Sequence, residues 1–87
     1  MEKSNYVKEL GEVLETCNTK KLIKFIEKWE KQGTINVGSA EVIRKKETKY
    51  QQGIMAKMIM GRTDLSQNAY DWAKRVLDKL GWYHDFC

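Results

Sequence analysis

The amino-acid sequence predicts an all-α fold, a small four-helix domain with a long central helix. Three observations support this prediction. The 87 residues contain no proline, and four of the six glycines stand where a helical pattern stops. Apolar residues recur at three- and four-residue spacing through most of the chain. The length and a composition of 41% hydrophobic and 32% charged residues indicate a single globular domain over residues 1–87.

The first two helices are expected to form a hairpin. Ser4 is expected to cap a helix that ends near Asn18, and Thr19 to cap a second helix that Gly33 closes. The apolar stripe of the first helix is Tyr6, Leu10, Val13, Leu14 and Cys17. The stripe of the second is Leu22, Phe25, Ile26 and Trp29. Because the joint between them is very short, both stripes must face a common partner.

That partner is the predicted central helix, which runs from Ser39 to Met60 with Ser39 as its cap and Gly61 as its stop. At about 1.5 Å per residue it would span about 33 Å, so the other helices must pack along it. Gly53 costs about 1 kcal/mol relative to alanine in a helix interior. It therefore marks either a close helix contact or a break into two shorter helices, and the continuous helix is the prediction adopted.

The remaining segments are a loop, a last helix and a tail. Residues 34–38 are expected to form a loop that turns Ile35 and Val37 inward. Ser66 is expected to cap the last helix and Gly81 to end it, with an apolar face made of Ala69, Trp72, Ala73, Val76, Leu77 and Leu80. The tail from residue 82 to 87 holds three aromatic residues, so it is expected to cover the bundle or to bind something.

No residue set in the sequence suits catalysis or a metal ion. A zinc site needs three or four ligands, whereas the chain has one histidine and two cysteines without paired spacing. His84, Asp85 and Cys87 are close only because they share a short tail. Carboxylate pairs such as Glu12 and Glu15 lie on exposed helix surfaces. We therefore expect a non-enzymatic protein without metal, cofactor or small-molecule substrate.

The sequence also bounds the location of the protein. No apolar run approaches the roughly 20 residues that cross a bilayer, so no membrane partner is expected. The first residues lack the charged and apolar regions of a signal peptide, which predicts a cytoplasmic protein.

The charge is concentrated in the middle of the chain. The segment Thr19–Arg62 holds eleven basic and four acidic residues, a net charge of +7, whereas the segments on either side carry −2 and −1. Such a surface favours a nucleic-acid partner. The candidate residues on the second helix are Lys20, Lys24, Lys28 and Lys31. Those on the central helix are Arg44, Lys45, Lys49 and Gln52.

Two interpretations of this basic segment stay open. In the first, the lysines contact phosphates, and Arg44, Lys45, Thr48 and Gln52 read bases in the major groove. In the second, the lysines only keep a small domain soluble. The connection from Gln32 to Ser39 is longer than a helix-turn-helix corner, which argues against a standard base reader.

A different class of function is a protein–protein adaptor or a homodimer. The methionine-rich end of the central helix and the aromatic tail would then form an adaptable surface for another protein or a second copy. The simpler alternative is that these side chains fill the core. The residues concerned on the helix are Met55, Met58, Ile59 and Met60.

Four segments of the sequence carry a resemblance: residues 4–10 (SNYVKEL), residues 14–25 (LETCNTKKLIKF), Lys57-Met58-Ile59 and Arg62-Thr63-Asp64. They resemble short proteins carried on conjugative transposons and related mobile elements of clostridia and other Firmicutes. The resemblance implies a bacterial cytoplasm and an accessory role in the maintenance, transfer or regulation of such an element. It implies a DNA or protein partner but no particular activity. Arg62-Thr63-Asp64 is the one polar cluster to consider as a site, and the alternative is a helix connection capped by Thr63 or Asp64.

Overall fold

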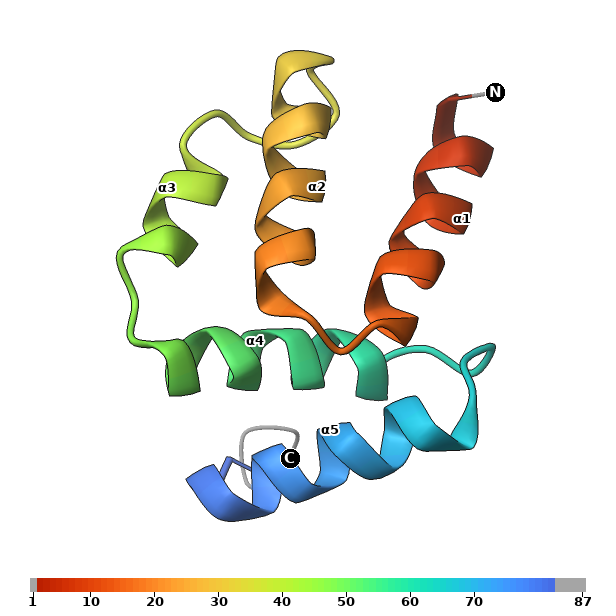
Figure 1. Ribbon diagram of the computed structural model, residues 1–87. Coiled ribbons are helices and arrows are strands. Elements are labelled where there is room, and N and C mark those ends of the chain that lie inside the picture. Colours follow the sequence, from red (N-terminus) through yellow and green to blue (C-terminus); the bar gives the residue numbers. More distant parts are fainter. Residues whose placement is uncertain (1, 83–87) are drawn as a thin grey trace.

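The computed structural model describes residues 2–82, with side chains from Asn5 onward, and this part of the chain is all-helical (Figure 1). The predicted all-α class is confirmed. The described residues form five helices rather than four, because the predicted central helix is two helices. They are α1 (Glu2–Glu15), α2 (Thr19–Lys31), α3 (Ser39–Arg44), α4 (Thr48–Met60) and α5 (Gln67–Leu80).

The five helices form two groups (Figure 1). The helices α1 and α2 stand side by side as a hairpin, and α3 lies along the other side of α2. The helix α4 crosses the lower ends of α1 and α2, and α5 runs back along α4. The predicted hairpin is therefore confirmed, and the common partner of its apolar stripes is α4 together with α5 rather than one long helix.

The hairpin turn differs from the prediction in its caps. The helix α1 begins at Glu2, so Ser4 lies inside it and does not precede it. Asn18, not Thr19, caps α2, and its side-chain oxygen accepts hydrogen bonds from the backbone N–H groups of Lys20 at 2.9 Å and Lys21 at 3.4 Å. An asparagine oxygen fits this role as well as a hydroxyl does.

The prediction of a continuous helix from Ser39 to Met60 is wrong, and the break lies before Gly53. Glu47 has extended backbone angles (φ −61°, ψ 155°) and precedes α4. The side-chain amide of Gln51 donates to the backbone carbonyls of Ile43 at 3.1 Å and Lys46 at 3.2 Å, and to that of Arg44 at 3.4 Å. Carbonyls at a helix end lack a partner within the helix, so Gln51 stabilises the point where α3 stops.

The break lets two packing contacts form that one straight helix could not make together. At the start of α3, the carboxylate of Glu30 on α2 accepts a hydrogen bond from the backbone N–H of Ala40 at 2.7 Å, and Ala40 is buried. The helix α4 meanwhile turns away and packs along α5 (Figure 1). In the loop before α3, Ile35 packs against the core as expected, but Val37 is 91% exposed, so the prediction for Val37 is wrong.

The core lies where the two groups of helices meet. Its largest fully buried side chains come from α1, α2, α4 and α5, and they are Leu14, Leu22, Met55, Ile59 and Leu77. Tyr6 packs edge-on against Trp29 at 5.4 Å between ring centroids and lies 5.2 Å from Phe25, which joins α1 to α2. Because Met55 and Ile59 are among the fully buried side chains, the methionine-rich end of α4 belongs mainly to the core.

Both ends of α5 have the predicted caps. The Ser66 hydroxyl accepts a hydrogen bond from the backbone N–H of Ala69 at 3.3 Å, and Gly81 ends the helix with a positive φ of 72° that glycine adopts without strain. Trp82 then folds back against α4. The rest of the tail, including His84, Asp85 and Cys87, lies outside the described residues.

Gly53 marks a close helix contact, one of its two predicted roles. A Cβ atom built at this position would lie 2.8 Å from Leu80 Cδ1 and 2.8 Å from Trp82 Cε3. A glycine is therefore required for α5 and the following tryptophan to approach α4 this closely.

Candidate nucleic-acid interface

The exposed side of α2 carries a row of lysines, which we call the lysine ridge: Lys20, Lys24 and Lys31. At 3.6 residues per turn these three positions fall within an arc of about 40° and extend over about 16 Å. All three residues are exposed and lie opposite the buried stripe of the helix. None of their ammonium groups has a hydrogen bond or ion pair to another described residue. The ridge is therefore an uncompensated positive surface within residues 2–82.

Lys28 belongs to the same helix face but is directed toward α1. Its ammonium group lies 2.8 Å from a carboxylate oxygen of Glu9 and 5.4 Å from the centroid of the Trp29 ring. Both partners of the ion pair are partly exposed, so the pair contributes at most about 1 kcal/mol. Lys28 therefore offers less uncompensated charge than the lysine ridge does.

The two predicted basic residues at the end of α3 also have carboxylate partners. The guanidinium of Arg44 donates to Glu27 on α2, an ion pair that joins the two helices. Lys45 lies 3.6 Å from Glu41 one turn earlier on its own helix. Three of the eight predicted residues, namely Lys28, Arg44 and Lys45, are thus paired within the fold.

The predicted base-reading helix does not exist. Arg44 ends α3, Lys45 follows it, and Thr48 begins α4, so these residues do not share one continuous helical face. A helix of six residues is too short to hold this set in a major groove. Lys49 is exposed on the first turn of α4, and Gln52 is partly buried one turn later. The base-reading interpretation required the continuous central helix, which the described residues do not form.

The structure instead brings aromatic and basic side chains together at the start of α4. The rings of Tyr50 and Trp82 meet edge-on with centroids 4.9 Å apart. The ammonium of Lys46 lies 5.0 Å from the Tyr50 ring, and that of Lys57 lies 5.1 Å from the Trp82 ring. Sequence reasoning did not identify this group, in which Tyr50 is 41% exposed. The available signal was the four-residue spacing of Lys46 and Tyr50.

The clefts beside the lysine ridge are of mixed charge. The cleft toward α1 is lined by acidic, basic and amide side chains: Asn5, Lys8, Glu9, Glu12, Lys28, Trp29 and Gln32. The cleft toward α3 is lined by Glu27, Glu30, Lys31, Val37, Gly38, Ala40, Glu41 and Arg44. An anionic ligand would therefore contact the ridge itself and not the clefts that flank it.

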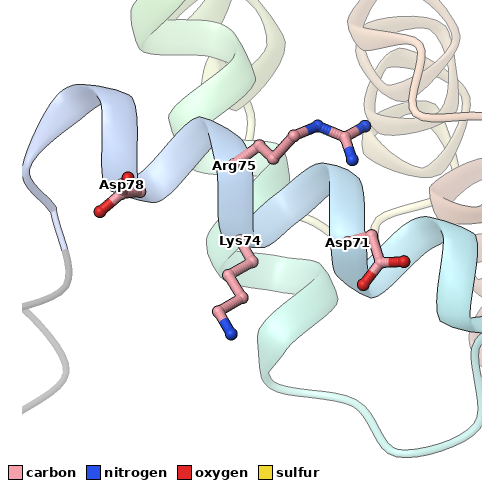
Figure 2. Close-up of a pocket in the computed structure, with 4 residues that line it drawn as sticks. All are labelled: Asp71, Lys74, Arg75 and Asp78. Carbon is pink, nitrogen blue, oxygen red and sulfur yellow. The ribbon is translucent and has the colours of Figure 1, made fainter.

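A further depression of about 350 Å³ lies on the outer face of α5 (Figure 2). Its lining residues are Asp71, Lys74, Arg75 and Asp78. Figure 2 shows the side chains of Lys74 and Arg75 leaving the helix in different directions, so the charged groups do not converge on one point. The depression has the character of an ordinary charged helix surface.

The polar cluster at Arg62 and Asp64 is a joint between helices. The guanidinium of Arg62 donates to both carboxylate oxygens of Asp64 at 3.0 and 2.8 Å, which lowers the pKa of Asp64 below its ordinary value and raises that of Arg62. The Tyr70 hydroxyl donates to the backbone carbonyl of Arg62 at 2.6 Å. Nearby, the backbone N–H and hydroxyl of Ser66 both donate to Glu15 of α1, at 2.8 and 2.6 Å. These bonds fix the start of α5 against α1.

Cys17 is the cysteine of the described region, and its thiol is a further group to consider for reactivity. It is partly buried, and its burial, together with the nearby Glu15 charge, raises the pKa of the thiol. It therefore lacks the lowered pKa of a reactive cysteine. Within residues 2–82, no group of three or more His, Cys, Asp or Glu side chains is placed to hold a metal ion.

Comparison with protein-family models, with curated proteins and with solved structures finds no match to this chain. None of the helices among the described residues has the length and apolar character needed to span a membrane.

Proposed function

We propose that this protein is a small non-enzymatic protein that binds nucleic acid through the basic surface of α2 and of the corner between α3 and α4. The observation that carries the proposal is the lysine ridge, three exposed lysines on one helix face without a carboxylate partner among the described residues. Lys49 adds a fourth exposed charge at the start of α4.

The physical basis is attraction to phosphates. Duplex DNA carries one negative charge per 1.7 Å of its axis, and lysines that neutralise phosphates release condensed counterions. The ridge extends over about 16 Å, long enough to meet several phosphates. Contacts of this kind give affinity without base preference. Binding by this protein should therefore weaken as the salt concentration rises and should depend only weakly on sequence.

The paired residues take a secondary role in the proposal. The ion pairs of Lys28 with Glu9 and of Arg44 with Glu27 are partly exposed to solvent. Because exposed ion pairs are weak, a phosphate can replace either carboxylate at small cost. The carboxylates that remain beside the ridge would then repel the ligand, so these residues should add less affinity than the ridge lysines.

The test compares two double variants that remove the same net charge. Lys20→Gln with Lys24→Gln removes two ridge charges, and Lys8→Gln with Lys79→Gln removes two exposed lysines from α1 and α5. Affinity for a fluorescent DNA duplex is measured by anisotropy from 50 to 200 mM salt. Each lost phosphate contact should reduce the slope of log affinity against log salt by about 0.9, so the ridge variant should lose about 2. Equal slopes for the two variants, or no binding by the wild type at 50 mM salt to either the duplex or a single strand, would overturn the proposal.

The resemblance in the sequence gives this proposal a setting. A protein that holds DNA without base preference suits an accessory role in the maintenance or transfer of a mobile element. We include that setting in the proposal, and the ridge variants test its physical basis.

A second candidate function is binding to another protein or to a second copy. Two exposed apolar side chains favour it, since Val37 is 91% and Val42 is 59% exposed. Both line a depression of about 410 Å³ together with Ile43. At the methionine-rich end of α4, by contrast, only Met60 is exposed. A sedimentation series tests self-association, because a monomer mass at every concentration would remove the second copy as the partner.

A further inference from the structure

We infer that Tyr50 and Trp82, with Lys46 and Lys49, form a stacking surface for unpaired bases, so that single-stranded nucleic acid is the ligand class this protein prefers. The inference rests on the proposed function and names the strand form that it favours. It also adds a contact that the lysine ridge lacks, namely one with the bases themselves.

Aromatic rings and positive charges lie together at this place on the surface. Tyr50 is 41% exposed, and its ring meets the Trp82 ring edge-on at 4.9 Å. The Lys46 ammonium lies 5.0 Å from the Tyr50 ring. Lys49 directly precedes Tyr50 in the chain. Proteins that bind single strands use this combination, in which aromatic rings stack on bases and nearby cations follow the backbone.

The Trp82 ring of this pair is held in place. Gly81 turns the chain with a φ of 72°, and the backbone N–H of Trp82 donates to the carbonyl of Leu77 at 2.9 Å. Gly53 leaves the space into which the Trp82 ring fits, because a Cβ there would lie only 2.8 Å from Cε3. A ring fixed in this way loses little freedom when a base stacks beside it.

A ligand that stacks on a side chain must offer an uncovered base. In a duplex, both faces of each base are covered by neighbouring bases, whereas an unpaired base can stack on a side chain. A base that stacks on Tyr50 would displace the Lys46 ammonium from the ring, a weak contact at an exposed site. The displaced ammonium would then lie near the phosphate of the same nucleotide. The Lys46 ammonium, 5.0 Å from the Tyr50 ring, therefore lies within reach of a strand whose base stacks on that ring.

The test uses Tyr50→Leu, which keeps an apolar side chain and a good helix former but removes the ring. Tyr50→Phe keeps the ring, and Val42→Ala is a control truncation at an exposed apolar position on α3. Affinities for a twelve-nucleotide oligo(dT) and for a twelve-base-pair duplex are measured by anisotropy, with circular dichroism melts to verify folding. Tyr50→Leu should weaken oligo(dT) binding about fivefold or more, and leave duplex binding within twofold. Tyr50→Phe and Val42→Ala should leave both unchanged.

A second measurement covers the case in which Tyr50→Leu unfolds. Oligo(dT) should quench part of the tryptophan fluorescence of the wild-type protein, and Trp82→Phe should abolish that quenching, because Trp82 is the tryptophan in the stacking surface. Oligo(dT) affinity that is equal in Tyr50→Leu and the wild type, or quenching that survives Trp82→Phe, would overturn the inference. Duplex binding that still depends on the lysine ridge would then leave the proposed function standing. No binding of either strand form would overturn both.

Discussion

Replacing Gln51 by glutamate should loosen the corner between α3 and α4. The Gln51 amide donates to the carbonyls of Ile43, Arg44 and Lys46 at 3.1, 3.4 and 3.2 Å. Glutamate has nearly the same shape, but its carboxylate has no N–H to donate. All three carbonyls would therefore lose this partner and would face a negative charge.

The size of the effect follows from the exposure of these bonds. An intramolecular hydrogen bond contributes about 0.5–1.5 kcal/mol net. The bond to Ile43 is partly buried, whereas the bonds to Arg44 and Lys46 are exposed, so water can replace the exposed ones. We therefore expect a loss of about 1–2 kcal/mol of unfolding free energy. In a domain of this size, 1 kcal/mol lowers the melting temperature by about 4–8 °C, so the variant should melt about 4–16 °C lower.

The neighbouring glutamine supplies the matched control. Gln52→Glu adds the same charge one residue further along α4, where the side chain is also partly buried but has no hydrogen bond to another described residue. Both variants are melted at neutral pH and followed by far-ultraviolet circular dichroism. If Gln51→Glu and Gln52→Glu melt within about 2 °C of each other, the Gln51 side chain does not stabilise the break, and this reasoning is refuted.

Two further predictions concern packing and acid stability. Gly53→Ala should cost about 1–3 kcal/mol in urea unfolding because its Cβ would clash with Leu80 and Trp82, whereas Gly61→Ala, with its nearest atoms at 3.6 Å, should be nearly neutral. Asp64 should stabilise the fold above its unfolded pKa, and this contribution should be lost as the pH falls through its folded pKa, which Arg62 lowers. Asp64→Asn should therefore flatten the loss of stability below about pH 4, and an unchanged acid profile would contradict this.

Local signals in the sequence were sufficient for the features that depend on a few neighbouring residues. The all-α class, the apolar stripes of the hairpin and the caps at Ser66 and Gly81 all follow from spacing and residue type. Neither the spacing nor the type of the residues predicts the break in the predicted central helix. Lys45, Lys46 and Glu47 are good helix formers, and neither glycine nor proline interrupts them. The break depends on the docking of α3 against α2, a contact between segments that helical periodicity cannot relate.

The same limit applies to the candidate site. Helical periodicity relates the lysines of α2 to one another, but it could not show that Lys28 meets Glu9 nineteen residues earlier or that Arg44 meets Glu27 seventeen residues earlier. Pairing across helices depends on the fold. Because Lys28 and Arg44 are paired with carboxylates on other helices, the net charge of +7 in the middle segment overstates the charge available to a ligand.

This difference sets the conditions under which binding can be observed. If only the three ridge lysines contact phosphates, the slope of log affinity against log salt is about −2.7, and affinity falls about 40-fold between 50 and 200 mM salt. If all seven lysines and arginines of the candidate set contacted phosphates, the slope would be about −6.3. The measured slope therefore distinguishes a ridge flanked by internal ion pairs from a uniformly basic surface. A modest slope with weak binding at physiological salt is the result that the ion pairs of Lys28 and Arg44 predict.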